Sequence, residues 1–338
     1  SASTMNGSFA SLPIIDLSTA KDGPEACQVI AERLRTAASE VGFFYLVNHS
    51  VPSDLTARAY DHLRRFFDLH MDEKMRVHTS KSEGVRGYVG FYEQGNYGLD
   101  LTDKRESAPA TQKMDAKELF CLGHALPRDH PNYHGILFAE NFWPEHDPDF
   151  KSTLDAYYKE TEILAKQLYS LFALGLGLPA DYFDSHIQES PMNSTNCLHY
   201  PPLPPDAPPD QMGIGEHTDY ECFTLLSTDS TPGLQIMASD GSWFDVPPMP
   251  EGFVVNIGDM MARWSNDLFR STVHRAQNRT NQHRYAIASF KACNFTTILR
   301  SLVPGTEKYA PICAGEHMLA RVAGANAPTV KDKVVPPK

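Results

Sequence analysis

The chain has 338 residues, a formal net charge of −12, and 41% hydrophobic against 21% charged residues, which is the composition of an ordinary globular protein. No apolar run approaches the roughly 18 residues of a membrane-spanning helix. Negative charge without a basic stripe disfavours nucleic acid and anionic membranes as partners. The six cysteines are scattered without a Cys-x-x-Cys pair, which predicts free thiols and a cytoplasmic location.

The amino-terminal region is predicted to mix strands and helices. Residues 1–11 are small and polar, and we expect a disordered lead or tag remnant there. Leu12 to Ser18 is expected to form a short strand, and the aromatic, β-branched run from Val41 to Pro52 a buried one. Two stripes with helical spacing, expected to belong to helices that pack on each other, follow these strands. The stripes consist of Val29, Ile30, Leu34 and Ala37, and of Leu55, Tyr60, Leu63, Phe66 and Phe67.

The middle of the chain loses this periodicity. Between Val77 and Asp115, Gly, Ser and Tyr predominate, which predicts an irregular excursion across a functional face. A helix that braces a sheet is predicted from Ser152 to Leu174, and "GLGLP" ends it. Its inward residues are predicted to be Ile163, Leu164, Leu168, Leu171 and Leu174. The tail from Ala323 onward is expected to be disordered.

Between Asn196 and Ile298 the sequence consists of short apolar stretches separated by turn residues. The strand candidates are Leu198–Tyr200, Gly213–His217, Phe223–Leu226, Leu234–Met237, Trp243–Asp245, Phe253–Ile257, Met260–Trp264, Ser271–His274 and Arg284–Phe290. Such density predicts a β-sandwich or barrel, most simply a jelly roll. The predicted fold class is α+β: a double-stranded β-helix (jelly-roll) core, an amino-terminal helical and mixed region, and flanking bracing helices.

Two His-x-Asp pairs occur, about as many as chance predicts for a chain with 14 histidines. The pair His70 and Asp72 closes a helical stretch, where positions i and i+2 diverge, so we interpret it as an exposed helix end. The pair His217 and Asp219 lies on a predicted strand, where i and i+2 point to the same face. Both side chains of the second pair can therefore reach one metal ion.

A third candidate ligand is His274, in the segment "RSTVHRAQNRTNQHRYAIASF". The turn-like residues 277–283 predict a hairpin that brings Arg284 close to His274. Two imidazoles and one carboxylate, with three coordination positions left open, form the facial triad of non-haem iron(II) oxygenases. The open positions suit a chelating 2-oxo acid and dioxygen.

The motifs "GEHTDY", "GLQI", "VVNIGDMMARWSND", "STVHR" and "RYAIASF", in this order and spacing, resemble the core of iron(II)/2-oxoglutarate-dependent dioxygenases of the isopenicillin N synthase-like superfamily. "LPIIDLS", "GFFYLVNHSVP", "RGYVG" and "DAKELFCLG" resemble that family's first domain. The wording "LLSTDSTPGLQI" is closest to the thymine 7-hydroxylase type. The resemblance implies an amino-terminal dioxygenase region (12–125), a linker and bracing helix (126–190), the jelly-roll core (191–298) and a carboxy-terminal segment (299–338).

Carried over residue by residue, the resemblance implies that His217, Asp219 and His274 bind the iron. It also implies that Arg284 pairs with the distal carboxylate of 2-oxoglutarate and that Tyr200 lends it a hydroxyl. Both roles agree with the chemistry of the side chains, because a guanidinium matches a carboxylate in bidentate geometry.

One residue departs from the family's Arg-x-Ser pattern. Ala286 stands where the serine hydroxyl would bond 2-oxoglutarate. The loss of one hydrogen bond to a charged group costs about 1–3 kcal/mol. We therefore expect weaker cosubstrate binding unless water or another hydroxyl, such as that of Thr272, takes its place.

Other polar and aromatic residues carry less specific signals. Arg86, Tyr88 and Tyr220 are candidates for a substrate wall, with the packing of an aromatic loop as the alternative. "VVNIGD", which contains Asn256 and Asp259, is interpreted as turn and strand-end structure.

The implied activity couples oxidative decarboxylation of 2-oxoglutarate, releasing succinate and CO2, to oxidation of an unactivated C–H bond by hydroxylation, desaturation or ring closure. The substrate is a small molecule; an amino acid, a nucleobase or a secondary metabolite would each fit. The chain is expected to act as a monomer without an obligate protein partner. Two alternatives are an isopenicillin N synthase-like oxidase that does not consume 2-oxoglutarate and a non-catalytic jelly-roll binding protein.

Overall fold

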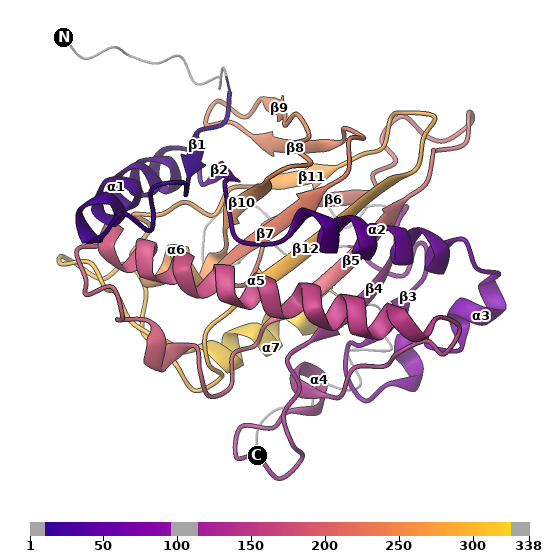
Figure 1. Ribbon diagram of the computed structural model, residues 1–338, viewed down its shortest axis with the longest axis horizontal. Helices are drawn as coiled ribbons and strands as arrows, with labels where there is room; N and C mark the ends of the chain where they lie inside the picture. Colours follow the sequence, from indigo (N-terminus) through magenta and orange to yellow (C-terminus); the bar gives the residue numbers. More distant parts are fainter. Residues whose placement is uncertain (1–10, 96–113, 326–338) are drawn as a thin grey trace.

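The computed structural model describes residues 11–95 and 114–325, whose two larger β-sheets face each other, with the three longest helices along one side (Figure 1). The strands are β1 (Ile14–Asp16), β2 (Phe43–Val47), β3 (Gly87–Val89), β4 (Glu118–Gly123), β5 (Ser194–Tyr200), β6 (Ile214–His217), β7 (Phe223–Thr228), β8 (Leu234–Met237), β9 (Trp243–Asp245), β10 (Phe253–Ile257), β11 (His274–Ala276), β12 (Arg284–Lys291), β13 (Ile298–Leu299) and β14 (Ile312–Cys313). The helices are α1 (Pro24–Glu40), α2 (Ser53–Phe67), α3 (Met71–Met75), α4 (Gly135–Phe138), α5 (Pro148–Gly175), α6 (Asp259–Trp264) and α7 (Ala314–Ala325), with 3-10 turns η1 (Thr79–Lys81) and η2 (Asp184–His186).

The two sheets build the predicted jelly-roll core. The large sheet has the order β1-β2-β10-β7-β12-β5-β4-β3, and the small sheet the order β6-β11-β8-β9. Strand β12 shows how the layers are arranged. Ile287 belongs to the core shared with α5, whereas Ala286 and Ala288 pack with Ala276 of the small sheet. Alternate residues of one strand thus serve the helical layer and the inside of the jelly roll.

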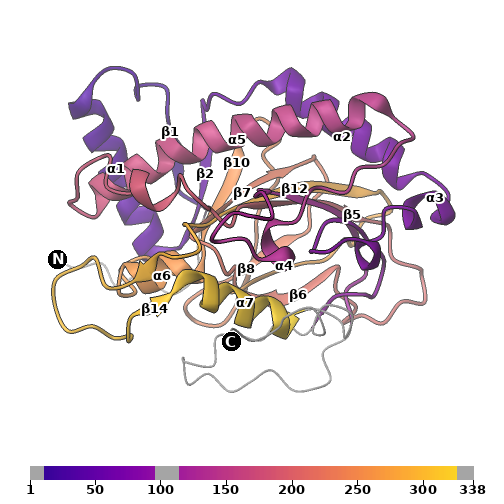
Figure 2. The ribbon, with the colours of Figure 1, turned by 90° about the horizontal axis from the view of Figure 1, so that it is seen from below.

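Helix α5 braces the large sheet, as predicted, and also supports the other long helices (Figure 2). It starts at Pro148. The preceding residue, Asp147, is its N-cap, and the Asp147 carboxylate accepts a hydrogen bond from the Asp149 amide at 3.1 Å. Helices α1 and α2 make their main helix contacts with α5, so the prediction that they pack on each other is wrong. Val29 and Ile163 are 50% and 59% exposed, so the predictions that Val29 belongs to a packed stripe and that Ile163 points inward are wrong. Their neighbours in sequence take the inward positions, since adjacent helical residues point about 100° apart.

The predicted irregular excursion contains regular structure. Strand β3 pairs antiparallel with β4 and extends the large sheet. Residues 96–113 of the excursion lie outside the described residues, as do residues 1–10 and 326–338 of the predicted lead and tail. Helix α7 continues to Ala325, slightly beyond the predicted start of the tail. No helix in the described ranges is long and apolar enough to cross a membrane.

Three predictions for the core are wrong in detail. Met260–Trp264 belongs to helix α6 instead of a strand, and three successive residues, Met260, Met261 and Ala262, are buried, which does not follow the alternation of a half-buried strand. The strand at His274 begins there instead of ending there. β11 and β12 do not form a hairpin, since β11 pairs with β6 and β8, and β12 pairs with β5 and β7. Residues 277–283 therefore cross from the small sheet to the large one.

Candidate metal centre

Two histidines and one aspartate converge at one end of the small sheet. His217 ends β6 and lies directly opposite His274, which begins β11. Asp219 follows β6 by two residues, and its Oδ1 lies 3.5 Å from Nε2 of His217 and 3.4 Å from Nε2 of His274. One ligand atom from each residue lies within 4.8 Å of the other two, and all three residues are buried. The structure thus brings together the three residues that the sequence proposed as metal ligands.

The second nitrogen of each imidazole is already used. Nδ1 of His217 lies 2.8 Å from the carbonyl oxygen of Gly215, and Nδ1 of His274 lies 3.0 Å from that of Thr272. A carbonyl can only accept, so each Nδ1 carries the proton and donates it. That leaves Nε2, which faces Oδ1 of Asp219 in both rings, as the nitrogen that would bind a metal ion.

The aspartate is oriented in the same way. Its Oδ2 accepts hydrogen bonds from the Asn256 amide at 2.7 Å and from the Thr224 hydroxyl. Burial alone would raise the pKa of Asp219, but His274 and His217 hold it well below its usual value. The carboxylate is therefore ionised, with Oδ1 facing the two imidazoles. Two neutral Nε2 donors and one carboxylate oxygen fit a divalent transition metal such as iron(II).

Helix α6 fixes the loop that carries Asp219. The Asp259 amide donates to the Asp219 carbonyl at 2.8 Å, and the Gly258 amide donates to the Cys222 carbonyl at 2.9 Å. A Cβ atom at Gly258 would lie 2.2 Å from the carbonyl oxygen of Glu221, so the contact requires glycine. The "NIGD" segment, interpreted from sequence as turn structure, therefore also supports the candidate ligand.

Arg284 and Tyr200 form a second cluster inside the jelly roll. They are opposite residues of β12 and β5, and the guanidinium lies 4.8 Å from the centre of the tyrosine ring. Arg284 is 3% exposed, and its Nε and Nη1 atoms have no hydrogen-bond partner among the described residues. An unpaired buried cation is costly, so this cluster fits an anion that enters the barrel.

A cavity of about 170 Å³ adjoins the candidate ligands. Arg86 and Tyr220, both predicted for a substrate wall, line it, together with Asn196 of β5 and Met318 of α7. Glu221 also lines it, and burial, reinforced by the charge of Asp219, raises the pKa of Glu221 to about 8. The cavity therefore combines an apolar lining with a few buried polar groups.

The structure does not bring Tyr88 into this cavity. Its ring is fully buried, and its hydroxyl donates to Glu118 at 2.7 Å. Gly87 explains the difference from Arg86: its φ of 93° lies in the left-handed region and interrupts the strand alternation that would place both side chains on one face.

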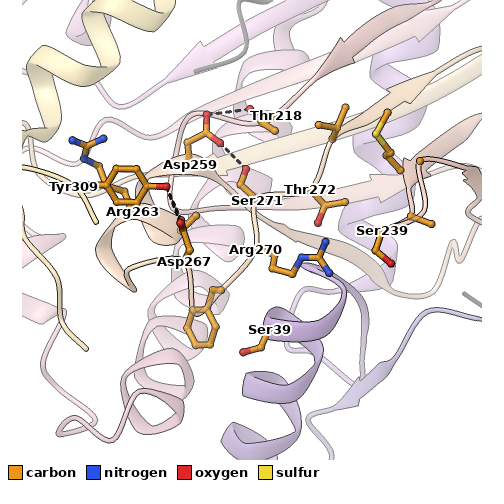
Figure 3. Close-up of a pocket in the computed structure, with 16 residues that line it drawn as sticks. Ser39, Thr218, Ser239, Asp259, Arg263, Asp267, Arg270, Ser271, Thr272 and Tyr309 are labelled. Atoms are coloured by element: carbon orange, nitrogen blue, oxygen red, sulfur yellow. Dashed lines mark hydrogen bonds between the residues drawn. The ribbon is translucent and has the colours of Figure 1, made fainter. Parts of the chain in front are cut away.

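A second, larger cavity of about 630 Å³ lies beside the first and meets it at Thr218 (Figure 3). Asp259 stands in its wall and accepts hydrogen bonds from the hydroxyls of Thr218 at 3.1 Å and Ser271 at 2.6 Å. Arg321 of α7 donates to the same carboxylate at 2.9 Å. Asp259 thus links both ligand-bearing segments to the carboxy-terminal helix.

Two buried histidines and one carboxylate inside a jelly roll are the ligand set of non-haem iron(II) oxygenases. Comparisons with known families agree with that class. Residues 12–146 match the family described as non-haem dioxygenase in morphine synthesis N-terminal, and residues 192–292 match the 2OG-Fe(II) oxygenase superfamily. The chain belongs to this superfamily and is an iron(II)- and 2-oxoglutarate-dependent oxygenase that acts on small molecules.

Relatives cover nearly the whole chain. Clavatol oxidase of Penicillium crustosum is 34% identical over 290 residues, which span 82% of this chain and 85% of that protein. A homoarginine-6-hydroxylase of Glycine max is 29% identical over 333 residues, which span 93% of this chain and 97% of that protein. The crystal structure of a full-length Neurospora crassa protein in complex with alpha-KG has a TM-score of 0.78 at 31% identity, covering 92% of this chain and 95% of that chain. The oxidase and binding-protein alternatives are not favoured.

Asn256 was missed as a supporting residue, and it offers a direct test. Replacing Asn256 by Ala leaves Oδ2 of Asp219 with one donor fewer, so we expect iron(II) affinity to fall about 10- to 100-fold. Competition with a chelator measures the change. Asn294→Ala is the control, because Asn294 is also buried but bonds backbone groups of Ser185, Glu189 and Ser190 instead of Asp219. Equal losses in both variants would contradict a specific role for Asn256.

Proposed function

We propose that His217 and His274 bind the iron(II) of this oxygenase through Nε2 and that Asp219 binds it through Oδ1. One observation carries the proposal: these three atoms converge, while the remaining polar atoms of the same side chains are held by the protein. Iron(II) bound there supplies the redox chemistry that couples 2-oxoglutarate decarboxylation to C–H oxidation. The surrounding protein groups hold the two imidazole rings and the Asp219 carboxylate in the orientation that metal binding requires.

We propose that Arg284 and Tyr200 hold the distal carboxylate of 2-oxoglutarate. The two unpaired guanidinium nitrogens and the buried position of both side chains support this role. A carboxylate that leaves water needs such charge-assisted donors. The Neurospora crassa protein, which this chain resembles along most of its length, was crystallised with alpha-KG.

We propose that the substrate occupies the cavity beside the ligands, against Arg86, Tyr220, Asn196 and Glu221. A volume near 170 Å³ favours a compact molecule with an apolar body and hydrogen-bonding groups along one edge. The Neurospora crassa protein was also crystallised with thymine, and other relatives are named for clavatol and homoarginine, which are likewise small molecules. All the residues proposed for iron and 2-oxoglutarate come from one chain, so a single protomer would hold both. The six free thiols support a reducing compartment such as the cytoplasm.

Stoichiometry tests the proposal. Metal-free protein reconstituted with iron(II) is expected to convert 2-oxoglutarate to succinate, slowly alone and faster when a panel of amino acids, nucleobases and phenolic compounds contains the substrate. His217→Ala should lose both iron binding and succinate formation. Oxidation of a panel compound with iron and oxygen but without 2-oxoglutarate consumption would instead establish the oxidase alternative.

A further inference from the structure

The inner face of the large sheet holds a hydroxyl where the family serine is missing. Thr228, the last residue of β7, lies directly opposite Ala286 of β12. Directly opposite residues of antiparallel strands point to the same face, with their Cβ atoms about 5 Å apart. Arg284 shares that face, since it lies two residues before Ala286. The Thr228 side chain therefore stands beside the methyl group that replaces the serine.

The Thr228 hydroxyl is buried and makes no hydrogen bond within the described residues. The residue is 5% exposed. Thr228 and Arg284 line the same small cavity, next to the unpaired guanidinium nitrogens. An unpaired hydroxyl and an unpaired guanidinium in one buried space both call for an acceptor.

Neighbouring hydroxyls are already used. Thr272, the substitute suggested by the sequence, donates to the Val41 carbonyl at 2.7 Å, which removes it as a candidate. Ser227 pairs with Tyr60 at 3.0 Å, and Ser289 with Thr195 at 3.2 Å.

We propose that Thr228 replaces the missing serine and donates its hydroxyl hydrogen to the distal carboxylate of 2-oxoglutarate, beside Arg284. This inference rests on the proposed role of Arg284. It assigns the anion site of this chain to donors from three adjacent strands: Thr228 from β7, Arg284 from β12 and Tyr200 from β5. In this proposal the hydroxyl comes from Thr228 on β7 instead of from a serine at position 286 on the neighbouring strand β12. The small side chain of Ala286 leaves room for it.

Binding of 2-oxoglutarate to manganese(II)-loaded protein, measured by calorimetry, tests the proposal without turnover. Thr228→Val keeps the shape but loses the donor, so the dissociation constant for 2-oxoglutarate is expected to rise about 10- to 100-fold. Thr228→Ser should stay within about threefold of the parent protein, because the hydroxyl remains. The double variant Thr228→Val with Ala286→Ser should recover most of the lost affinity, because it restores a hydroxyl on the neighbouring strand.

A ligand without the distal carboxylate distinguishes a specific contact from a general loss of binding. 2-Oxopentanoate has the same chelating end but no distal carboxylate, so Thr228→Val should bind it as the parent protein does. An unchanged 2-oxoglutarate constant in Thr228→Val, or a loss that neither Ser variant restores, would overturn the inference. Arg284→Met distinguishes its failure from that of the proposed function: if Arg284→Met weakens 2-oxoglutarate binding and Thr228→Val does not, only the role of Thr228 fails.

Discussion

Replacing Asp219 by Ala is expected to abolish iron(II) binding and 2-oxoglutarate turnover while the protein stays folded. In the proposed site Asp219 would provide the one anionic ligand atom, since its Oδ1 lies within 3.5 Å of both candidate imidazole nitrogens. Without it, two neutral nitrogens remain, and the transition-state stabilisation of several kcal/mol that a bound metal supplies is lost. We expect a rate at least about a thousandfold lower.

Folding and metal loss can be measured separately for this variant. The alanine leaves the Asn256 amide and the Thr224 hydroxyl without their shared acceptor, which should cost about 1–3 kcal/mol of unfolding free energy. Denaturant unfolding of the metal-free protein measures that cost, and elemental analysis measures bound iron. Asp240→Ala, at an exposed turn, is the control for a lost aspartate. Stoichiometric iron and normal turnover in Asp219→Ala would exclude Asp219 as a ligand.

Residue type and order in the sequence were enough to single out the three residues that the structure brings together, but not the residues that support them. His217 ends β6, Asp219 follows it by two residues, and His274 lies in a motif of its own. Asn256 and Thr224 act on Asp219 because β10 lies beside β7 and places these two residues opposite each other. That register arises from the pairing of whole strands, which no local pattern encodes.

The prediction of a hairpin between β11 and β12 failed for a similar reason. Residues 277–283 have the composition of a turn, and a turn between neighbouring strands is the most frequent arrangement. In this fold they join two different sheets, and Gln277 is anchored instead by its side-chain amide to the carbonyl of Gln211 at 2.7 Å. Thr228 could not be connected with Ala286 from the sequence either, because their proximity depends on the β7–β12 register.

Replacing Arg284 by Met is expected to weaken 2-oxoglutarate binding by about a hundredfold or more, with iron affinity unchanged. Removal of one partner from a buried charge pair costs about 2–5 kcal/mol, because the other charge is left unpaired. Arg284→Lys keeps the charge but not the fork of donors, so it should recover part of the loss. The KM for 2-oxoglutarate and its calorimetric dissociation constant should rise together.

Arg35→Met provides the control for a lost arginine, because the Arg35 guanidinium donates to the Gly175 carbonyl between α1 and α5 and does not belong to the anion site. 2-Oxopentanoate adds a second comparison: without a distal carboxylate it gains nothing from Arg284, so its affinity should be nearly equal in the parent protein and in Arg284→Met. If both 2-oxo acids weaken equally, the arginine supports the barrel in general. If neither weakens, the distal carboxylate binds elsewhere, and the unpaired guanidinium needs another anion.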